Sequence, residues 1–325
     1  MKPQFPDCAN LKAPAGSVVM MNYSTGEVIA LASYPTFDNR WFNSGISGDK
    51  FSEIFPKTDD PDKSLLVNRA IQGQYNLGSS FKPFVAYAAL DTGQLPGGSE
   101  YRYLDQGEYT LVSIDKETCQ MIKCIYRNAL CGGGNYACRY GKVNVEDALA
   151  VSSDTFFYKI GEEIFSERGG QPILQEEVRK FGFGSFTGID LPFESAGRVP
   201  DKESKKKLVE SGVLMEGESP KYLVGDNVQL SVGQGLLAAT PLQLAQAYGA
   251  LANGGDVNRP LIALALLEPG TPNSDQVGVA DLTKSKVALN LGTKDTIRSL
   301  ALPPEVLDPI VRGLSRVITG PGVFY

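Results

Sequence analysis

Two residues three positions apart, Ser79 and Lys82, are the strongest candidates for chemistry in this sequence. On a helix this spacing puts both side chains on one face, one turn apart, so the amine can reach the hydroxyl. The same spacing recurs in three polar segments, at Ser47–Lys50, Ser113–Lys116 and Ser204–Lys207. Ser79 differs because a glycine turn precedes it and an almost wholly apolar segment follows it. We therefore interpret Ser79 as a serine at the start of a buried helix.

A helix N-terminus favours nucleophilic chemistry at Ser79. Backbone N–H groups point outward there and the macrodipole is positive, so the N–H of Ser79 can help to hold an oxyanion. The dipole and apolar burial disfavour the ammonium form of Lys82 and lower its pKa, and a neutral lysine can act as a general base. The alternative is a helix-capping serine with a surface lysine.

The sequence contains no histidine. This excludes a Ser–His–Asp triad and a histidine metal site, so a serine nucleophile must use a lysine or a carboxylate as its base. We predict no metal and no cofactor.

A second polar group, Ser152-Ser153-Asp154, follows the apolar residues 148–151. A serine in a turn between helices can relay a proton, and a neighbouring carboxylate can orient a lysine. The alternative is a helix cap.

Composition limits the possible partners. The 325 residues carry a net charge of about −6, which argues against a nucleic-acid partner. The run Lys205–Lys207 is interpreted as a solvated loop. The longest apolar run, residues 261–267, is far shorter than the roughly twenty residues of a membrane span. No signal peptide is evident, and we expect that any membrane anchor lies upstream.

The pattern of elements is mostly helical with one clear hairpin. Residues 16–22 and 27–33 predict a β-hairpin, and residues 35–68 and 97–142 predict irregular or loop-rich structure. Helices are expected from Ser79 to near Gly93, from 145 to 165 with a break near Ser152–Ser153, from 240 to 252, and from 304 to 318, with a polar loop at 196–221. Beyond 257–267 we find no good strand, so we expect a sheet that lacks some of its members.

Four of the five cysteines, Cys119, Cys124, Cys131 and Cys138, fall within twenty residues, while Cys8 stands alone. Two disulfides or one four-thiolate zinc site are possible, and the spacing favours disulfides, with all three pairings open. Disulfides would imply an oxidising compartment outside the cytoplasm.

The combined motifs carry a family resemblance over nearly the whole chain. The segments that carry it are 13–38, 68–75, 78–83, 152–158, 187–192, 231–235, 240–243, 253–255 and 319–322. Together they resemble the transpeptidase domain of class B penicillin-binding proteins, above all the elongation type, penicillin-binding protein 2.

The resemblance implies an α/β (α+β) penicillin-binding protein/β-lactamase-like fold, with an antiparallel sheet flanked by helices and an all-helical subdomain. Residues 1–12 would be a remnant of a linker or pedestal, and residues 13–325 a transpeptidase domain that is incomplete at its C-terminal end.

The resemblance also implies a mechanism. Ser79 would attack the D-Ala–D-Ala carbonyl of a peptidoglycan stem peptide, Lys82 would take its proton, Ser152 would pass protons, and Asp154 would contact Lys82 and the substrate. β-Lactams would acylate Ser79. A glycosyltransferase of the elongation machinery is the expected partner, on the outer face of the bacterial cell membrane. The implied substrate-binding residues are Gly78, Ser80, Ser153, Gly233, Gln234 and Gly235.

Two departures from the family pattern affect the expectation. Asp154 stands where asparagine is commoner, and an anion near Lys82 favours the charged amine. No Lys-Thr-Gly motif is present, which would remove a carboxylate contact and one oxyanion donor, typically worth about 10²–10³ in rate. We therefore expect this chain to be an incomplete protein of low activity and stability. A D,D-carboxypeptidase or β-lactamase-like hydrolase and a non-catalytic penicillin-binding fragment are the alternatives.

Overall fold

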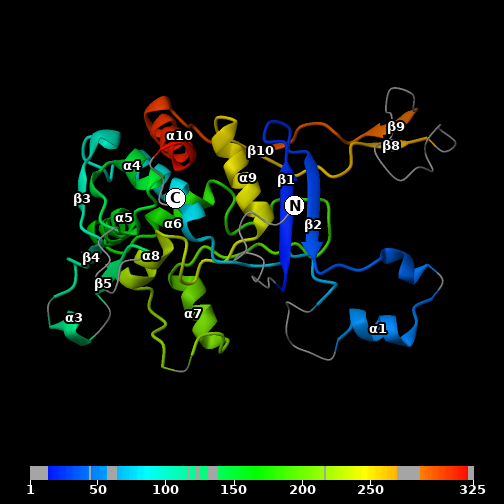
Figure 1. Cartoon of the computed structure of the whole chain (residues 1–325), viewed down its shortest axis with the longest axis horizontal. Coiled ribbons are helices and arrows are strands. Elements are labelled where there is room, and N and C mark those ends of the chain that lie inside the picture. Colours follow the sequence, from blue (N-terminus) through cyan, green and yellow to red (C-terminus); the bar gives the residue numbers. More distant parts are fainter. Residues whose placement is uncertain are drawn as a thin grey trace, which may run out of the picture.

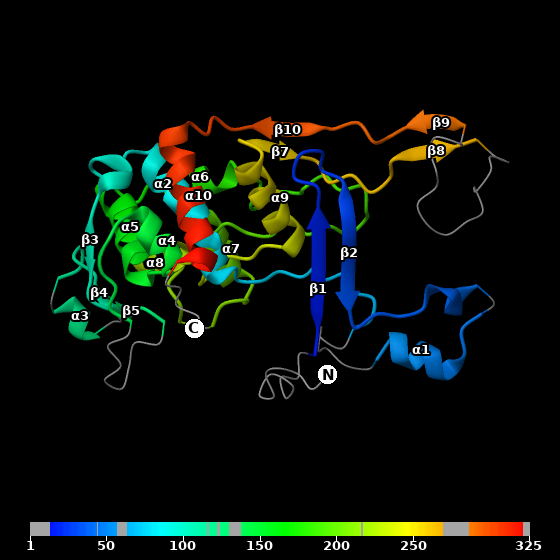
Figure 2. The same cartoon turned by 45° about the horizontal axis from the view of Figure 1, so that its top comes forward.

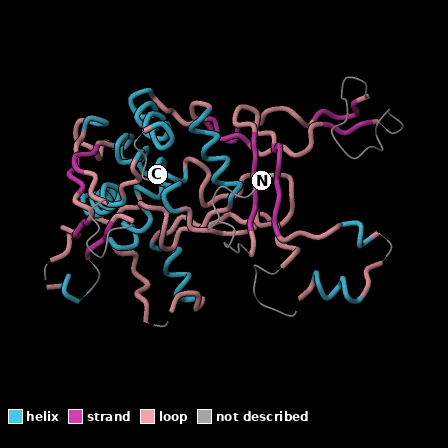
Figure 3. Tube along the Cα trace, in the orientation of Figure 1, coloured by secondary structure: helices cyan, strands magenta, loops and turns pink. Residues whose placement is uncertain are grey.

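The computed structural model describes residues 14–43, 45–56, 64–115, 117–121, 124–129, 138–215, 217–268 and 286–320. The helices in these ranges are α1 (Gly48–Ile54), α2 (Lys82–Asp91), α3 (Thr118–Met121), α4 (Val145–Ala150), α5 (Asp154–Glu167), α6 (Ile173–Arg179), α7 (Lys202–Glu210), α8 (Val224–Leu230), α9 (Pro241–Ala252) and α10 (Pro304–Thr319). The strands are β1 (Gly16–Met21), β2 (Val28–Tyr34), β3 (Tyr103–Asp105), β4 (Glu108–Thr110), β5 (Ile125–Arg127), β6 (Gly141–Val143), β7 (Asp256–Asn258), β8 (Ala265–Leu267), β9 (Val287–Asn290) and β10 (Thr296–Ser299). Most helices gather in one body beside the β1–β2 hairpin (Figures 1 and 3).

The predicted N-terminal hairpin is confirmed. β1 and β2 pair antiparallel, with Gly16 opposite Tyr34 at one end and Met21 opposite Val28 at the other. The turn between them needs Gly26, because a Cβ there would lie 2.3 Å from the carbonyl oxygen of Arg259. Helix α9 lies along β1 (Figures 1 and 2), and this packing covers one face of the hairpin.

Helix α2 is the centre of the main core. All its residues from Pro83 to Ala89 are buried, which suits a segment that is apolar on every side. The ring of Phe84 packs edge-on against Phe181 and Phe183, with ring centroids 5.0 and 4.9 Å away. The α-helix proper begins at Lys82, because Ser79 lies in a 3₁₀ turn, Gly78–Phe81, that leads into it.

The predicted break between two helices near Ser152–Ser153 is confirmed. Helix α4 ends at Ala150 and α5 begins at Asp154, where the Ser153 hydroxyl caps it by accepting the backbone N–H of Phe156 at 3.2 Å. The predicted helices at 240–252 and 304–318 are also confirmed, as α9 and α10.

The prediction of a polar loop at 196–221 is wrong, because α7 occupies its centre. Asp201 and Ser204 form a capping box that starts this helix. The solvated interpretation of the lysine run is correct for Lys207, whose side chain is exposed, but wrong for Lys205. The ammonium of Lys205 is buried and lies 2.7 Å from the Asp226 carboxylate.

The prediction that good strands are lacking elsewhere is also wrong. Strands β3 to β6, β9 and β10 are each three or four residues long and form two-stranded antiparallel sheets, in which β3 pairs with β6, β4 with β5, β7 with β10 and β8 with β9. Such short strands are defined by their pairing rather than by a pattern within the strand. Helix α1 similarly interrupts the segment that was predicted to be irregular.

The fold class is nevertheless the one predicted, an α/β arrangement of helices with small antiparallel sheets. The all-helical subdomain, the incompleteness of the sheet and a domain that starts at residue 13 stay predictions, and the expected linker remnant at 1–12 lies outside the described residues. Within the described ranges, no helix combines the length and the apolar character that crossing a membrane requires.

Candidate active site

The candidate nucleophile lies at an exposed turn in front of the buried helix α2. Gly78 has a φ of +55°, and its N–H donates to the Gly233 carbonyl at 2.9 Å. The Ser80 hydroxyl donates to the Leu77 carbonyl at 2.7 Å, and the Ser80 carbonyl accepts the hydroxyl of Tyr248 at 2.9 Å. These contacts fix the backbone on both sides of Ser79 while its side chain stays accessible.

Gly233 is buried against this turn. A Cβ at Gly233 would lie 2.3 Å from the Gly78 carbonyl oxygen and 2.7 Å from the Phe81 Cβ, so no other residue fits without moving the turn. Gln234 and Gly235 are exposed, and the Gln234 amide nitrogen lies near Gly78. Of the six predicted substrate-binding residues, Gly233 and Ser153 are buried, so they support the turns rather than line the open face.

Ser152 occupies an unusual backbone position at the end of α4. The N–H of Ser152 bonds to the Leu149 carbonyl and the N–H of Ser153 to the Ala148 carbonyl, which is the Schellman pattern of a helix C-terminus. The first of these positions is left-handed and normally holds glycine, yet Ser152 adopts it with a φ of +55°. A residue other than glycine keeps this conformation only where its surroundings hold it strongly.

Lys82 joins the two serine turns. Its side chain is 1% exposed, and its Nζ donates to the Ser152 carbonyl at 2.8 Å, to the Ser152 Oγ at 3.0 Å and to the Asp154 Oδ1 at 2.5 Å. The Ser152 hydroxyl in turn donates to the Ser79 Oγ at 2.9 Å. The lysine and the candidate nucleophile are therefore connected through the Ser152 hydroxyl.

Burial lowers the pKa of the Lys82 ammonium, and the negative charges of Asp154 and Asp105 oppose this shift. The net effect is a lowered pKa, so Lys82 loses its proton more readily than an exposed lysine does. The aspartate that stands at position 154 in place of the commoner asparagine therefore reduces the effect of burial on the pKa of Lys82 but does not reverse it.

The second oxygen of Asp154 is held by the backbone. Asp154 Oδ2 accepts the N–H of Ala129 at 3.0 Å, while Oδ1 faces Lys82. The carboxylate also lies in the first turn of α5, where the helix dipole favours a negative charge. Asp154 is therefore oriented from both sides.

Sequence reasoning missed two buried polar residues behind this turn, Asp105 and Asn128. Asp105 accepts the Ser153 hydroxyl at 2.5 Å, and the Asn128 amide nitrogen donates to both Asp105 oxygens at 2.9 Å. An aspartate followed two residues later by a glycine signalled a turn at Asp105, but nothing in the sequence linked it to Ser153.

The cysteines agree with the disulfide interpretation where they are described. Cys119 and Cys124 form a disulfide, and Cys138 is also disulfide-bonded. Cys8 and Cys131 lie outside the described residues. Within the described ranges, no group of acidic or cysteine side chains gathers in a way that could hold a metal ion.

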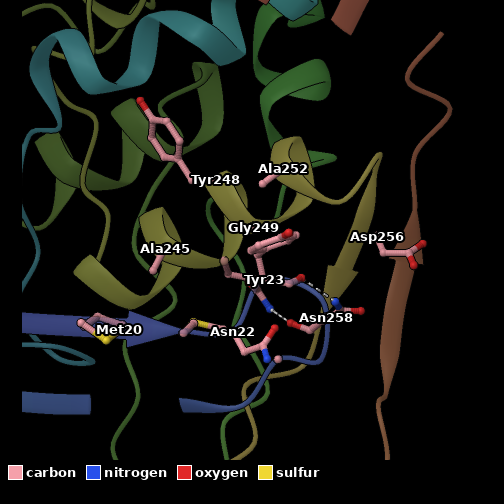
Figure 4. A pocket seen from close by; sticks show the side chains of 13 residues that line it. Met20, Asn22, Tyr23, Ala245, Tyr248, Gly249, Ala252, Asp256 and Asn258 are labelled. Atoms are coloured by element: carbon pink, nitrogen blue, oxygen red, sulfur yellow. Dashed lines mark hydrogen bonds between the residues drawn. The ribbon is translucent and has the colours of Figure 1, made fainter. Parts of the chain in front are cut away.

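A cavity of about 410 Å³ lies between β1 and α9. Figure 4 shows Met20, Asn22 and Tyr23 on one side of it and Ala245, Tyr248 and Gly249 on the other. Tyr248 connects this cavity to the site, because its hydroxyl bonds to the Ser80 carbonyl.

The arrangement permits one kind of chemistry in particular. Each hydroxyl hydrogen can rotate, so that Ser79 donates to Ser152 and Ser152 donates to a neutral Lys82 along the same contacts. A proton can then pass from the Ser79 hydroxyl through Ser152 to the amine, which leaves an alkoxide able to attack a carbonyl. An accessible serine, a second serine hydrogen-bonded to it and a buried lysine that contacts the second serine, on an α/β fold, form the arrangement expected of a lysine-assisted serine acyl-transfer protein.

Comparison with known proteins identifies the family. The model of the penicillin binding protein transpeptidase domain matches residues 16–291, and the chain belongs to that family. The peptidoglycan D,D-transpeptidase MrdA of Escherichia coli (strain K12) is 34% identical over 260 residues, which cover 80% of this chain and 36% of that protein. MrdA of Acinetobacter baumannii is 30% identical over 306 residues, 94% of this chain and 39% of that protein.

Solved structures agree. Pseudomonas aeruginosa PBP2 in complex with WCK 5153 is 30% identical and matches with a TM-score of 0.69 over 94% of this chain and 57% of that chain. Helicobacter pylori PBP2 in complex with MreC is 26% identical, with a TM-score of 0.66. The chain spans less than half the length of the curated relatives named here.

Proposed function

We propose that this chain is part of a peptidoglycan D,D-transpeptidase that cross-links stem peptides through an acyl-enzyme on Ser79. The observation that carries the proposal is the connection of the Ser79 hydroxyl to the buried Lys82 amine through the Ser152 hydroxyl, at 2.9 and 3.0 Å. The lowered pKa of Lys82, caused by burial, supports its role as the base.

The reaction proceeds in two balanced halves. Ser79 Oγ attacks the carbonyl of the D-Ala–D-Ala bond, and its proton moves through Ser152 to Lys82. The C–N bond then breaks, and the same proton returns through Ser152 to the nitrogen of the departing D-alanine. In the second half, an amine of another stem peptide attacks the Ser79 ester and gives its proton to Lys82. The Ser79 alkoxide leaves and recovers that proton.

The charges around Lys82 fit this cycle. The lysine must be neutral before each attack and charged after it, and Asp154 stabilises the charged form at 2.5 Å. Burial makes the neutral form of Lys82 easier to reach, while Asp154 stabilises the ammonium that Lys82 becomes after it takes a proton. The two opposed effects suit a group that must take and return a proton.

The expected setting follows from the relatives and from the cysteines. The curated relatives are named as peptidoglycan transpeptidases, and one PBP2 structure is a complex with MreC. We propose that the full protein acts outside the cytoplasmic membrane, anchored by a segment beyond this chain, with a glycosyltransferase of cell elongation as partner. The Cys119–Cys124 disulfide supports an oxidising compartment.

The test is the fate of the acyl-enzyme. The full-length protein is given a peptide ending in D-Ala–D-Ala together with an amine acceptor peptide, and released D-alanine and cross-linked product are measured. A transpeptidase gives product that rises with acceptor concentration, and Ser79→Ala abolishes both signals. Release of D-alanine without cross-linked product would identify a D,D-carboxypeptidase instead. Binding of penicillin with neither release of D-alanine nor cross-linked product would identify a non-catalytic module.

A further inference from the structure

A buried polar cluster lies directly behind the turn that carries Ser152 and Asp154. We propose that two of its members, Asp105 and Asn128, are positioning residues for acyl transfer, which hold this turn in place and set the charge that surrounds Lys82. The proposal rests on the proposed function for its reaction, but its structural part concerns Lys82 in the free protein. Neither residue touches the candidate nucleophile.

Asp105 is the anchor of the cluster. Its side chain is 1% exposed, and its carboxylate accepts the Ser153 hydroxyl at 2.5 Å, the Gly107 N–H at 2.8 Å and the Asn128 amide at 2.9 Å. Burying a carboxylate is costly unless hydrogen bonds compensate it, and these three donors do so. One of the three, Ser153, lies between Ser152 and Asp154 in the chain.

Asn128 ties the cluster to the first turn of α5. Its amide nitrogen also donates to the Cys138 carbonyl at 2.8 Å, and its amide oxygen accepts the N–H of Thr155 at 2.9 Å. The following residue, Ala129, donates its N–H to Asp154 Oδ2 at 3.0 Å. Two consecutive residues after β5 therefore hold α5 at the points that orient Asp154.

The hydrogen bonds of Asp105 and Asn128 explain how Ser152 keeps its strained conformation. A non-glycine residue in the left-handed region persists only where its surroundings determine it strongly. The Schellman bonds hold Ser152 from the side of α4, and the bond from Ser153 to Asp105 holds it from the other side. Without the cluster, the Ser152 hydroxyl would lose its fixed place between Ser79 and Lys82.

Asp105 also contributes charge. Its negative charge favours the ammonium of Lys82, as does that of Asp154, against the stronger effect of burial on the pKa. Among the described residues, Tyr103, Tyr140 and Tyr158 interact electrostatically with Asp105 or Asp154, and burial raises the pKa of each. These tyrosines stay neutral near pH 7, so the two carboxylates are the charges that adjust Lys82.

The positioning role is tested with matched variants of two buried asparagines. Asn128→Leu removes the contacts behind the active turn. Asn227→Leu is the control, because Asn227 is 1% exposed and holds a comparable network, donating to the Gly161 carbonyl at 2.7 Å and accepting from Gln175 at 2.9 Å. Both variants should be destabilised. Per folded molecule, we expect penicillin acylation to slow about 10²-fold in Asn128→Leu and to stay unchanged in Asn227→Leu. Equal rates in the two variants would overturn the positioning role.

The charge role is tested with Asp105→Asn, which keeps the shape of the side chain and removes its charge. Lysine side chains labelled with ¹³C are titrated by NMR, which reports the pKa of Lys82 whether or not the protein is catalytic. We expect Lys82 to titrate at lower pH than in the wild type, with the acidic limb of the acylation profile displaced in the same direction. An unchanged titration of Lys82 would overturn the proposal. Failure of penicillin to acylate the full-length wild type would count against the proposed function, and the titration would still decide the role of Asp105.

Discussion

Replacing Ser152 with glycine separates what its backbone requires from what its side chain does. Ser152 has a φ of +55° at a helix end where glycine is the usual residue, and its hydroxyl bridges Lys82 and Ser79. Ser152→Ala keeps the backbone strain and removes the hydroxyl, whereas Ser152→Gly removes both. The comparison of these two variants therefore isolates the strain.

The magnitude follows from the conformation. A residue with a Cβ pays roughly 1–2 kcal/mol in the left-handed region, and glycine avoids this cost. Glycine loses more backbone freedom on folding than alanine, and this loss destabilises the glycine variant by about 0.5–1 kcal/mol relative to the alanine variant. The hydroxyl contacts are absent from both variants and cancel. Ser152→Gly should therefore be more stable than Ser152→Ala by about 1 kcal/mol, or about 2 °C in Tm for a chain of this size.

Thermal unfolding measures the stability difference, and the rate of acylation by a fluorescent penicillin measures function. Both variants lose the hydroxyl through which a proton reaches Lys82, so acylation should fall by about 10²–10⁴ in each. An alanine variant as stable as the glycine variant would refute the strain argument. A glycine variant that acylates at the wild-type rate would refute the relay.

Three further variants test other parts of the account. Asp154→Asn removes a charge that favours the ammonium of Lys82, so the pKa of Lys82 should fall further and the acidic limb of the acylation profile should move to lower pH; a move to higher pH would contradict the account. Gly233→Ala forces a Cβ against the nucleophile turn, and we expect acylation at least 10-fold slower, measured with the same penicillin, whereas a wild-type rate would show that the turn tolerates displacement. Lys205→Ala leaves Asp226 without its buried partner and should lower the free energy of unfolding by about 3 kcal/mol in denaturant titration, which a loss below about 1 kcal/mol would contradict.

The sequence was sufficient for the parts of the site that local patterns encode. The apolar helix that begins at Lys82 and the helix break at Ser152 follow from runs of apolar residues and from turn residues. The disulfide interpretation followed from the close spacing of the cysteines and is confirmed for Cys119 and Cys124. In each case the deciding interactions lie within a few residues of one another.

The parts that were missed depend on contacts between distant segments. Asp105 meets Ser153 across 48 positions, and Asn128 meets Thr155 across 27, so neither contact has a local signature. The strands near Asp105 are three residues long and exist through their pairing. Helix α7 was missed for another reason, since its charged residues suggested a loop, although the capping box from Asp201 to Ser204 was a readable start signal.

The central claim is that the Ser79 hydroxyl is the nucleophile and that Lys82 receives its proton through Ser152. The most direct measurement is peptide-level mass spectrometry of the full-length protein after incubation with penicillin, compared with its Ser79→Ala and Lys82→Met variants. The account predicts one penicilloyl group on Ser79 in the wild type, none in Ser79→Ala, and formation slowed by about 10²–10⁴ in Lys82→Met. An adduct on a different serine, or full-rate acylation in Lys82→Met, would contradict it.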